Sequence, residues 1–237
     1  MSRVVDAVRL RATVARHRGD AVHCPVCDSR FDGFKDDWNR AGALCWRCGS
    51  HERHRAQWLL LQRRPELLRE TRSLLHFSPE WCLRRRLAAT PGLRYVTTDL
   101  DLEQEVDLRL DVTALDLPDG AFDAVLCSHV LEHVPDDAAA MRELRRVTAA
   151  KGFCLVMVPL ALDRERTYED ASITAPADRE RAFLQFDHVR LYAPDIAERL
   201  RRAGFDVETI DLTRELGREA ARYRLLESDL IFLCRPA

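Results

Sequence analysis

Short apolar runs alternate with amphipathic segments along most of the chain, from about residue 72 to the end. "SLLHFS", "FDAVLCS" and "FCLVMVPL" are compact apolar runs of strand length. "DDAAAMRELRRVTAA" instead repeats its apolar residues at helical spacing, with two aspartates at its positive end. Buried strands that alternate with helices are typical of a doubly wound, mostly parallel α/β sheet.

The same pattern continues to the C-terminus. It predicts helices at "EWCLRRRLAAT" and "APDIAERLRRAGF", and strands at "RYVTTDL", "DVETIDL" and "SDLIFLCRPA". The start of the chain differs, because an arginine-rich helical stretch precedes two cysteine pairs. We therefore expect two domains: a small module over residues 1–70 and the α/β domain over residues 71–237.

The composition is that of an ordinary soluble globular protein, with 46% hydrophobic and 32% charged residues and a net charge of −2. Residues 1–70 carry 14 Lys+Arg against 9 Asp+Glu, whereas the rest carries 23 against 30. No apolar run approaches the roughly 20 residues of a membrane helix, and no signal-peptide core is present. We expect a cytoplasmic protein with no membrane partner, either a monomer or a homodimer.

Four cysteines form two tight pairs, Cys24 with Cys27 and Cys45 with Cys48. Cysteines of a cytoplasmic protein stay reduced, so this spacing indicates a metal site rather than disulfides. Four thiolates suit a closed, structural Zn²⁺ site; a chance pair of doublets is the alternative. His51 and His54 follow closely and are interpreted as polar surface or interface residues.

Polar residues follow the predicted strands, where a doubly wound sheet binds its ligand. Asp99 ends the second strand of the α/β domain, and a carboxylate there suits the diol of a ribose. Asp111 can accept a hydrogen bond from an adenine amino group. Taken singly, each aspartate has an alternative role as a turn former or helix cap.

The segment "LDVTALDLPDGAFDAVLCSHVLEHVPDD" resembles the centre of Rossmann-like S-adenosylmethionine-dependent methyltransferases, and the likeness covers about residues 72–235. It implies a methyltransferase with S-adenosylmethionine as cofactor and a seven-stranded sheet that ends in an antiparallel hairpin. By similarity, Asp99 holds the ribose hydroxyls, Asp111 and Val112 flank the adenine, and the Ser128–His129 turn approaches the methionine part. The four-cysteine zinc-ribbon start, with "GSHERHR", "HFSPE" and "QFDHVRLY", resembles a bacterial subgroup of these enzymes.

The turn "HFSPE" departs from the family, whose loop at this place is rich in glycine. A pyrophosphate needs close backbone approach, so a nicotinamide or flavin dinucleotide is disfavoured. S-adenosylmethionine has no phosphate: Glu80 can accept from its amino group, and Ser78 or a backbone N–H can meet its carboxylate. A plain helix start at Pro79 is the alternative. The candidate cofactor contacts are Phe77, Ser78, Pro79, Glu80, Asp99, Leu100, Asp111, Val112, Ser128 and His129.

A long polar segment follows "FCLVMVPL" and ends in "QFDHVRLY". His188 is the candidate general base, which a carboxylate such as Asp187 can orient. Its alternative role is to brace the segment. Arg190 can bind an acidic acceptor. The candidate substrate contacts are Tyr168, Arg190, Tyr192 and His133.

The favoured function is methylation of a small-molecule acceptor, at oxygen rather than nitrogen or carbon. The first alternative is a ribosomal or transfer RNA methyltransferase, which the basic start favours and the acidic remainder argues against. The second is a non-enzymatic zinc-ribbon interaction protein with a degenerate methyltransferase fold, an idea that the missing glycines suggest.

Overall fold

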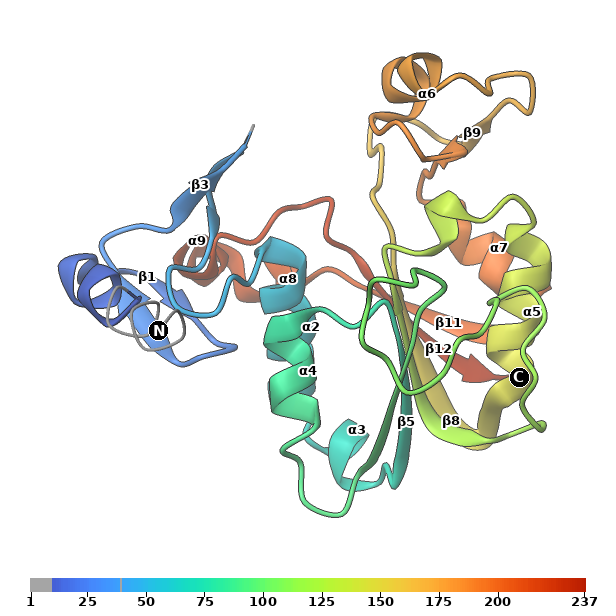
Figure 1. Cartoon of the computed structure of the whole chain (residues 1–237), viewed down its shortest axis with the longest axis horizontal. Helices are drawn as coiled ribbons and strands as arrows, with labels where there is room; N and C mark the ends of the chain where they lie inside the picture. The colour runs from blue at the N-terminus through green and yellow to red at the C-terminus, as the bar shows by residue number, and fades with distance from the viewer. Residues whose placement is uncertain (1–9, 39) are drawn as a thin grey trace. The chain divides into compact units, whose positions relative to one another are not determined.

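A computed structural model describes residues 10–38 and 40–237, which form two compact units (Figure 1). The first unit holds the described residues up to Leu68 together with Glu80–Ala89 and Asp211–Glu227. The second unit holds Arg69–Pro79, Thr90–Ile210 and Ser228–Ala237. This grouping differs from a single boundary at residue 70, because two later segments join the first unit. The N-terminal helix expected at the start lies partly outside the described residues; residues 10–16 are helical.

The second unit is built on one central sheet. Among the described residues it has six strands, in the order β11-β12-β8-β7-β5-β6. The four strands from β8 to β6 run parallel, whereas β12 is antiparallel to both β8 and β11. This confirms the mostly parallel α/β sheet and its final antiparallel hairpin. The strands are β5 (Ser73–Phe77), β6 (Arg94–Thr98), β7 (Phe122–Ser128), β8 (Thr148–Met157), β11 (Phe205–Ile210) and β12 (Ile231–Pro236).

The expected seventh strand is reduced to one parallel bridge, Thr98 with Leu108, beside the edge strand β6. Asp107 explains why the pairing stops there. Its carboxylate accepts from the backbone N–H of Thr97 at 2.8 Å and from the Thr97 hydroxyl at 2.7 Å. A side chain therefore takes an edge hydrogen bond that a longer ladder would use.

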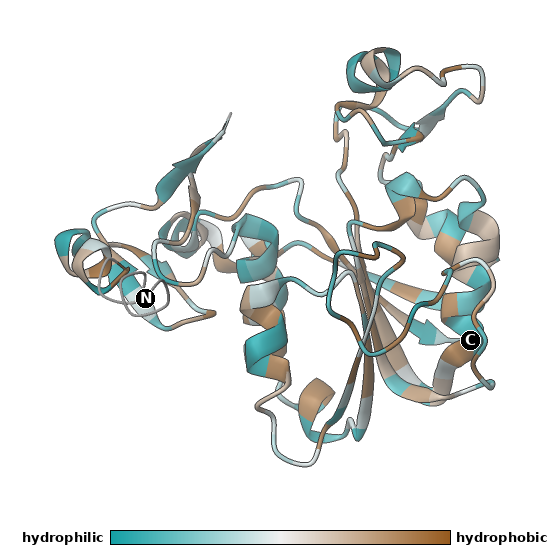
Figure 2. Cartoon of the chain, in the orientation of Figure 1, coloured by the Kyte–Doolittle hydropathy of each residue, from teal (hydrophilic) through white to brown (hydrophobic). Residues whose placement is uncertain are grey.

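Two helices of the second unit, α5 (Asp137–Val147) and α7 (Ile196–Arg202), lie on the same side of the sheet (Figure 1). Asp136 caps α5 by accepting from the N–H of Ala139 at 2.8 Å. The apolar faces of both helices join the strands in one buried core. Figure 2 shows the hydrophobic residues concentrated along the strands.

The long polar segment after β8 contains short elements only: β9 (Tyr168–Glu169), α6 (Pro176–Phe183) and β10 (Arg190–Leu191). β9 and β10 pair antiparallel to each other and belong to no larger sheet of the described residues. A short 3-10 turn, η1 (Leu131–His133), follows β7.

The first unit contains two small antiparallel hairpins; Cys24 and Cys27 lie at the turn of the first, and Cys45 and Cys48 follow the second. β1 (Arg18–Cys24) pairs with β2 (Ser29–Phe31), and β3 (Lys35–Asp37) pairs with β4 (Arg40–Leu44). Besides the helical residues 10–16, the helices of this unit are α2 (Glu52–Arg63), α4 (Trp81–Leu87), α8 (Leu212–Leu216), η2 (Gly217–Glu219) and α9 (Ala220–Tyr223). The division of the chain into units falls within α3 (Glu66–Arg69), between Leu68 and Arg69.

Arg55 ties the first unit together from within. Its side chain is fully buried and donates to the carbonyls of Ala43 at 2.9 Å, Ser50 at 2.6 Å and Tyr223 at 2.7 Å. A buried charge is tolerated only when it is hydrogen-bonded, and these carbonyls meet that requirement. Arg55 thus links the second cysteine pair to α9, which is distant in sequence.

In the part of the chain that the structure describes, no helix combines the length and apolar character that crossing a membrane requires.

Candidate functional site

A pocket of about 680 Å³ opens at the carboxyl ends of β5, β6 and β7, and all of its lining residues belong to the second unit. Its size lies within the usual range for small-molecule sites, roughly 300–1,000 Å³. The position agrees with the rule that ligands of open α/β sheets bind beyond the strand ends. The lining residues are Phe77, Ser78, Asp99, Leu100, Asp101, Leu110, Asp111, Val112, Thr113, His129, Val130, His133, Val134, Pro135, Asp136 and Asp187.

The turn after β5, which lacks the glycines of the family loop, has a glycine-like backbone at Ser78. Its φ of 46° lies in the left-handed region, which non-glycine residues rarely adopt. Its N–H donates to the carbonyl of Thr98 at 2.9 Å, and this bond helps to hold the turn. His129, in the turn after β7, has a φ of 55°. Ser78 and His129 therefore adopt a backbone conformation that usually requires glycine, which costs about 1–2 kcal/mol at each position.

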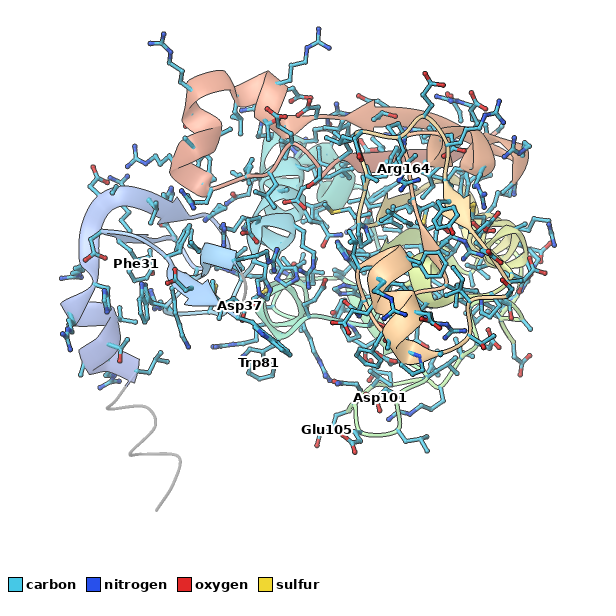
Figure 3. All side chains as sticks on the ribbon, turned by 90° about the horizontal axis from the view of Figure 1, so that it is seen from above. Phe31, Asp37, Trp81, Asp101, Glu105 and Arg164 are labelled. Carbon is cyan, nitrogen blue, oxygen red and sulfur yellow. The ribbon has the colours of Figure 1, made fainter. Side chains whose placement is uncertain are left out.

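Two aspartates, Asp99 and Asp111, line the pocket, and one carboxylate oxygen of each accepts hydrogen bonds from its own turn. Asp99 accepts from the N–H of Asp101 at 2.9 Å. Asp111 accepts from the N–H of Thr113 at 2.8 Å and from its hydroxyl at 2.7 Å. These bonds fix both carboxylates, and each has a second oxygen to offer a ligand. Figure 3 shows Asp101 and Glu105 on the loop that continues from Asp99.

Most of the predicted cofactor contacts meet at this pocket: Phe77, Ser78, Asp99, Leu100, Asp111, Val112 and His129. Pro79, Glu80 and Ser128 are not among its lining residues. Ser128 is a buried residue at the end of β7. The cofactor roles of all ten residues stay predictions.

Glu80 lies beside a buried histidine of the first unit. Its Oε1 is 3.2 Å from Nε2 of His54. His54, interpreted from the sequence as a surface or interface residue, is in fact only 4% exposed. Burial lowers the pKa of His54, although the hydrogen bond to Glu80 opposes the shift. The structure thus gives Glu80 a protein partner that the sequence did not suggest.

A group of histidine and acidic side chains forms one wall of the pocket. Nδ1 of His133 is 3.2 Å from a carboxylate oxygen of Asp187, and both residues line the pocket. His188 lies edge-on to His133, with the ring centroids 4.8 Å apart, and is 5% exposed. Burial lowers the pKa of His188, and the charge of Glu132 opposes the shift. Asp187 thus pairs with His133, while His188 contacts the ring of His133 and does not line the pocket.

The other predicted substrate contacts brace the polar segment. Arg190 is buried and donates to Glu169 at 3.0 Å and to the carbonyls of Leu131 at 3.0 Å and Pro135 at 2.9 Å. Its guanidinium therefore holds the backbone around η1. Arg190 does not line the pocket at the strand ends, and its predicted contact with substrate stays a prediction.

Tyr192 and Tyr168 also have protein partners. The fully buried Tyr192 donates to Asp137 at 2.8 Å, and burial raises its pKa well above the usual value. Tyr168 packs against Phe183, with ring centroids 5.6 Å apart, and the guanidinium carbon of Arg164 lies 5.4 Å from the centroid of the Tyr168 ring. Arg164 is labelled in Figure 3. Neither tyrosine lines the cofactor pocket, and their roles toward substrate stay predictions.

Sequence reasoning missed the rest of the turn that follows β7. Val130, Val134, Pro135 and Asp136 also line the pocket, and Glu132 is buried beside His129 and His188. The sequence did carry a signal for these residues, because few residues separate the end of β7 from Asp136, the N-cap of α5. A connection this short keeps every residue near the carboxyl end of the strand.

The four cysteines of the first unit form one cluster. Their sulfur atoms all lie within 4.8 Å of one another, and the pairs Cys24–Cys48 and Cys27–Cys45 are both separated by 3.6 Å. Zn–S bonds of about 2.3 Å in a tetrahedron place sulfurs roughly 3.8 Å apart. Asp28 and Gly49, which directly follow the two pairs, both have left-handed φ values, 52° and 68°. The two knuckles therefore turn alike, and the donor set fits a four-coordinate metal.

Comparisons with known proteins agree with this fold. Residues 85–156 match the family model described as a methyltransferase domain. No curated protein matches the sequence. The crystal structure of the 4+2 cyclase SpnF has a TM-score of 0.56 at 17% identity and covers 97% of this chain and 92% of its own. An S-adenosylmethionine-dependent methyltransferase from Archaeoglobus fulgidus has a TM-score of 0.51 at 15% identity, covering 78% of this chain and 94% of its own.

At these identities the solved structures show the fold alone, which is the Rossmann-like fold of S-adenosylmethionine-dependent methyltransferases. The segment that matches the methyltransferase-domain model, residues 85–156, includes β6, β7 and most of β8 of the sheet.

Proposed function

We propose that the protein methylates a small-molecule acceptor, at oxygen in preference to nitrogen or carbon. The observation that carries the proposal is the pocket in which Asp99 and Asp111 stand beside the turns of Ser78 and His129. Two fixed carboxylates suit the hydroxyl and amino donors of an adenosine, and no phosphate site is required. The cyclase among the structural relatives shows that this fold also supports other reactions, so the site rather than the fold supports the function.

S-adenosylmethionine, when bound, would supply a methyl group on a positively charged sulfur, and transfer of that group to an acceptor oxygen would leave the electron pair of the C–S bond on sulfur. The protein must orient the acceptor and take its proton. We assign proton removal to the group of His133, Asp187 and His188, in which His133 and Asp187 line the pocket and the ring of His188 contacts that of His133. The lowered pKa of His188 keeps its imidazole neutral at pH 7, the form that a general base needs.

We also propose that the four cysteines bind a structural Zn²⁺. Four thiolates complete a tetrahedral shell and leave no position for substrate. The Ser50 hydroxyl, 3.1 Å from the sulfur of Cys24, can donate to a thiolate there and so stabilise its negative charge.

An RNA acceptor is the second candidate, and one observation favours it. A pocket of about 390 Å³ in the first unit is lined by Arg47, Arg85 and Arg86, beside Cys48 and Trp81. Trp81 is 66% exposed and projects outward from α4 (Figure 3). Arginines next to an exposed indole suit a phosphate and a stacked base.

Transfer of a labelled methyl group separates the candidates. The zinc-loaded chain is incubated with methyl-labelled S-adenosylmethionine and either a panel of small alcohols, phenols and amines or bulk transfer and ribosomal RNA. We expect label in a hydroxyl compound and none in RNA at low ionic strength. Label in RNA that is lost when Arg47 and Arg85 are replaced by alanine would establish the second candidate instead.

A further inference from the structure

Glu132, His133 and His188 form a group of side chains that cofactor binding does not explain. One donor atom from each residue lies within 4.8 Å of the donor atoms of the other two. Glu132 and His133 come from η1, whereas His188 comes from the end of the long polar segment. Two separate parts of the second unit are thus brought together at the wall of the cofactor pocket.

Glu132 has an unsatisfied oxygen. Its side chain is only 2% exposed, and Oε1 lies 3.3 Å from Nδ1 of His129. Its Oε2 is buried without a hydrogen-bond partner among the described residues. A buried polar atom in this state loses its hydration without a replacement, and the loss is larger when the atom is charged. A cation bound to Oε2 would remove that cost.

Both histidines are held in the orientation typical of metal ligands. Nδ1 of His188 is 3.0 Å from the carbonyl of Phe183, and Nδ1 of His133 is 3.2 Å from the carboxylate of Asp187. These acceptors place the proton on Nδ1 and leave the lone pair on Nε2. Metal-binding histidines almost always donate their other N–H to a carboxylate or a carbonyl in this way.

We propose that Glu132, His133 and His188 bind a divalent transition-metal ion at the pocket wall. Two imidazoles and one carboxylate suit Mn²⁺, Fe²⁺, Co²⁺ or Zn²⁺, and they are too few oxygens for Ca²⁺ or Mg²⁺. Three protein ligands leave coordination positions for water or an acceptor. His133 lines the pocket, whereas Glu132 and His188 are buried next to it, so the ion would lie at the edge of the pocket.

The catalytic role of this ion rests on the proposed function, although its binding does not. An ion at the pocket wall would lower the pKa of an acceptor hydroxyl, so that the proton leaves to solvent. The oxygen then bonds to the methyl carbon. This role would replace the one proposed above for His188: with an ion bound, its imidazole is a ligand, and without an ion it is the general base.

Binding of Co²⁺ to the full chain tests the proposal, after the four-cysteine site has been saturated with Zn²⁺ and excess zinc removed. Equilibrium dialysis measures the amount bound. Absorption spectra identify the ligands, because Co²⁺ on thiolates gives a sulfur-to-metal charge-transfer band that a nitrogen and oxygen site lacks. We expect one Co²⁺ per chain without that band. Glu132→Gln and His188→Asn should each weaken binding at least tenfold, and Asp187→Asn, which only loosens His133, by a smaller factor.

Glu165→Gln is the matched control, because Glu165 is an exposed residue of the same polar segment. It should bind Co²⁺ like the wild type. No bound Co²⁺ in the wild type, or equal binding in all variants, would overturn the proposal. Calorimetric binding of S-adenosylhomocysteine is measured on the same samples. If the wild-type chain binds S-adenosylhomocysteine but no Co²⁺, only the proposed ion site is refuted. If the wild-type chain does not bind S-adenosylhomocysteine, the proposed function is refuted.

Discussion

The four-cysteine cluster and the cofactor pocket are held together in different ways. The cluster draws its side chains from two knuckles within residues 24–48, and only a bound metal would join their sulfurs. The pocket draws its lining from turns between residues 77 and 187, which the sheet already holds in place. Loss of one cysteine should therefore cost the first unit its stability. Loss of one pocket residue should cost affinity and leave the fold intact.

The largest effect is expected at the cysteines. Cys27→Ser should abolish zinc binding and unfold the first unit, because zinc binding contributes about 10–16 kcal/mol in small zinc domains. Metal content and thermal melting measure the effect. Cys82→Ala is the control, since Cys82 is a buried cysteine of the same unit outside the cluster and should retain zinc. Full zinc content in Cys27→Ser would refute the proposal that all four cysteines bind the zinc ion.

Asp99→Ala should show the opposite behaviour. Losing a carboxylate that bonds the ribose hydroxyls removes about 1.5–3 kcal/mol, or roughly 10- to 150-fold in affinity. The melting temperature should change little, because Asp99 is only partly buried. Equilibrium dialysis with S-adenosylmethionine measures the loss. Glu105→Ala, on the same loop but outside the pocket lining, should bind as the wild type does (Figure 3). Equal affinities of the two variants would rule out Asp99 as the ribose ligand.

A smaller effect is expected where the pocket stores backbone strain. Ser78→Gly should raise the free energy of unfolding by about 1 kcal/mol, because glycine adopts a φ of 46° without a steric cost. Ser78→Val should lower it. Urea denaturation gives both values, and Ser78→Ala separates the loss of the hydroxyl from the backbone effect. A glycine variant less stable than the alanine variant would mean that Ser78 is not strained.

The smallest effect is a pH dependence near β9. The hydrogen bond from Arg199 holds the pKa of Glu169 below its usual value. A lowered carboxyl pKa stabilises the fold above the unfolded value of about 4.3, and the contribution disappears as the pH falls through the folded value. Glu169→Gln should therefore melt below the wild type at pH 7 and close to it at pH 3. The same gap at both pH values would show that the charge of Glu169 does not matter.

The sequence was sufficient where chemistry is local or where topology fixes position. Two cysteine pairs predict their own cluster, and the strand-end rule places Asp99 and Asp111 at one pocket edge. It was insufficient where the outcome depends on which partner a polar side chain finds. The sequence did not show that Tyr192 donates to Asp137 or that Arg190 donates to backbone carbonyls around η1, and the roles of both residues toward substrate stay predictions.

Backbone conformation was also beyond the sequence. A turn without glycine indicated a departure from the family, and nothing in the residue types showed that Ser78 adopts the left-handed conformation instead. The sequence also did not predict how the sheet ends. The side chain of Asp107 bonds to the edge strand β6, and the expected seventh strand is reduced to a single bridge.

Calorimetric titration of the zinc-loaded chain with S-adenosylhomocysteine tests the central claim most directly, because it asks whether the strand-end pocket binds the cofactor without the family's glycines. We expect one molecule bound per chain, with affinity lost in Asp99→Ala and retained in Glu105→Ala. Absence of binding to folded, zinc-loaded protein would contradict it and would favour a non-enzymatic protein on a methyltransferase fold.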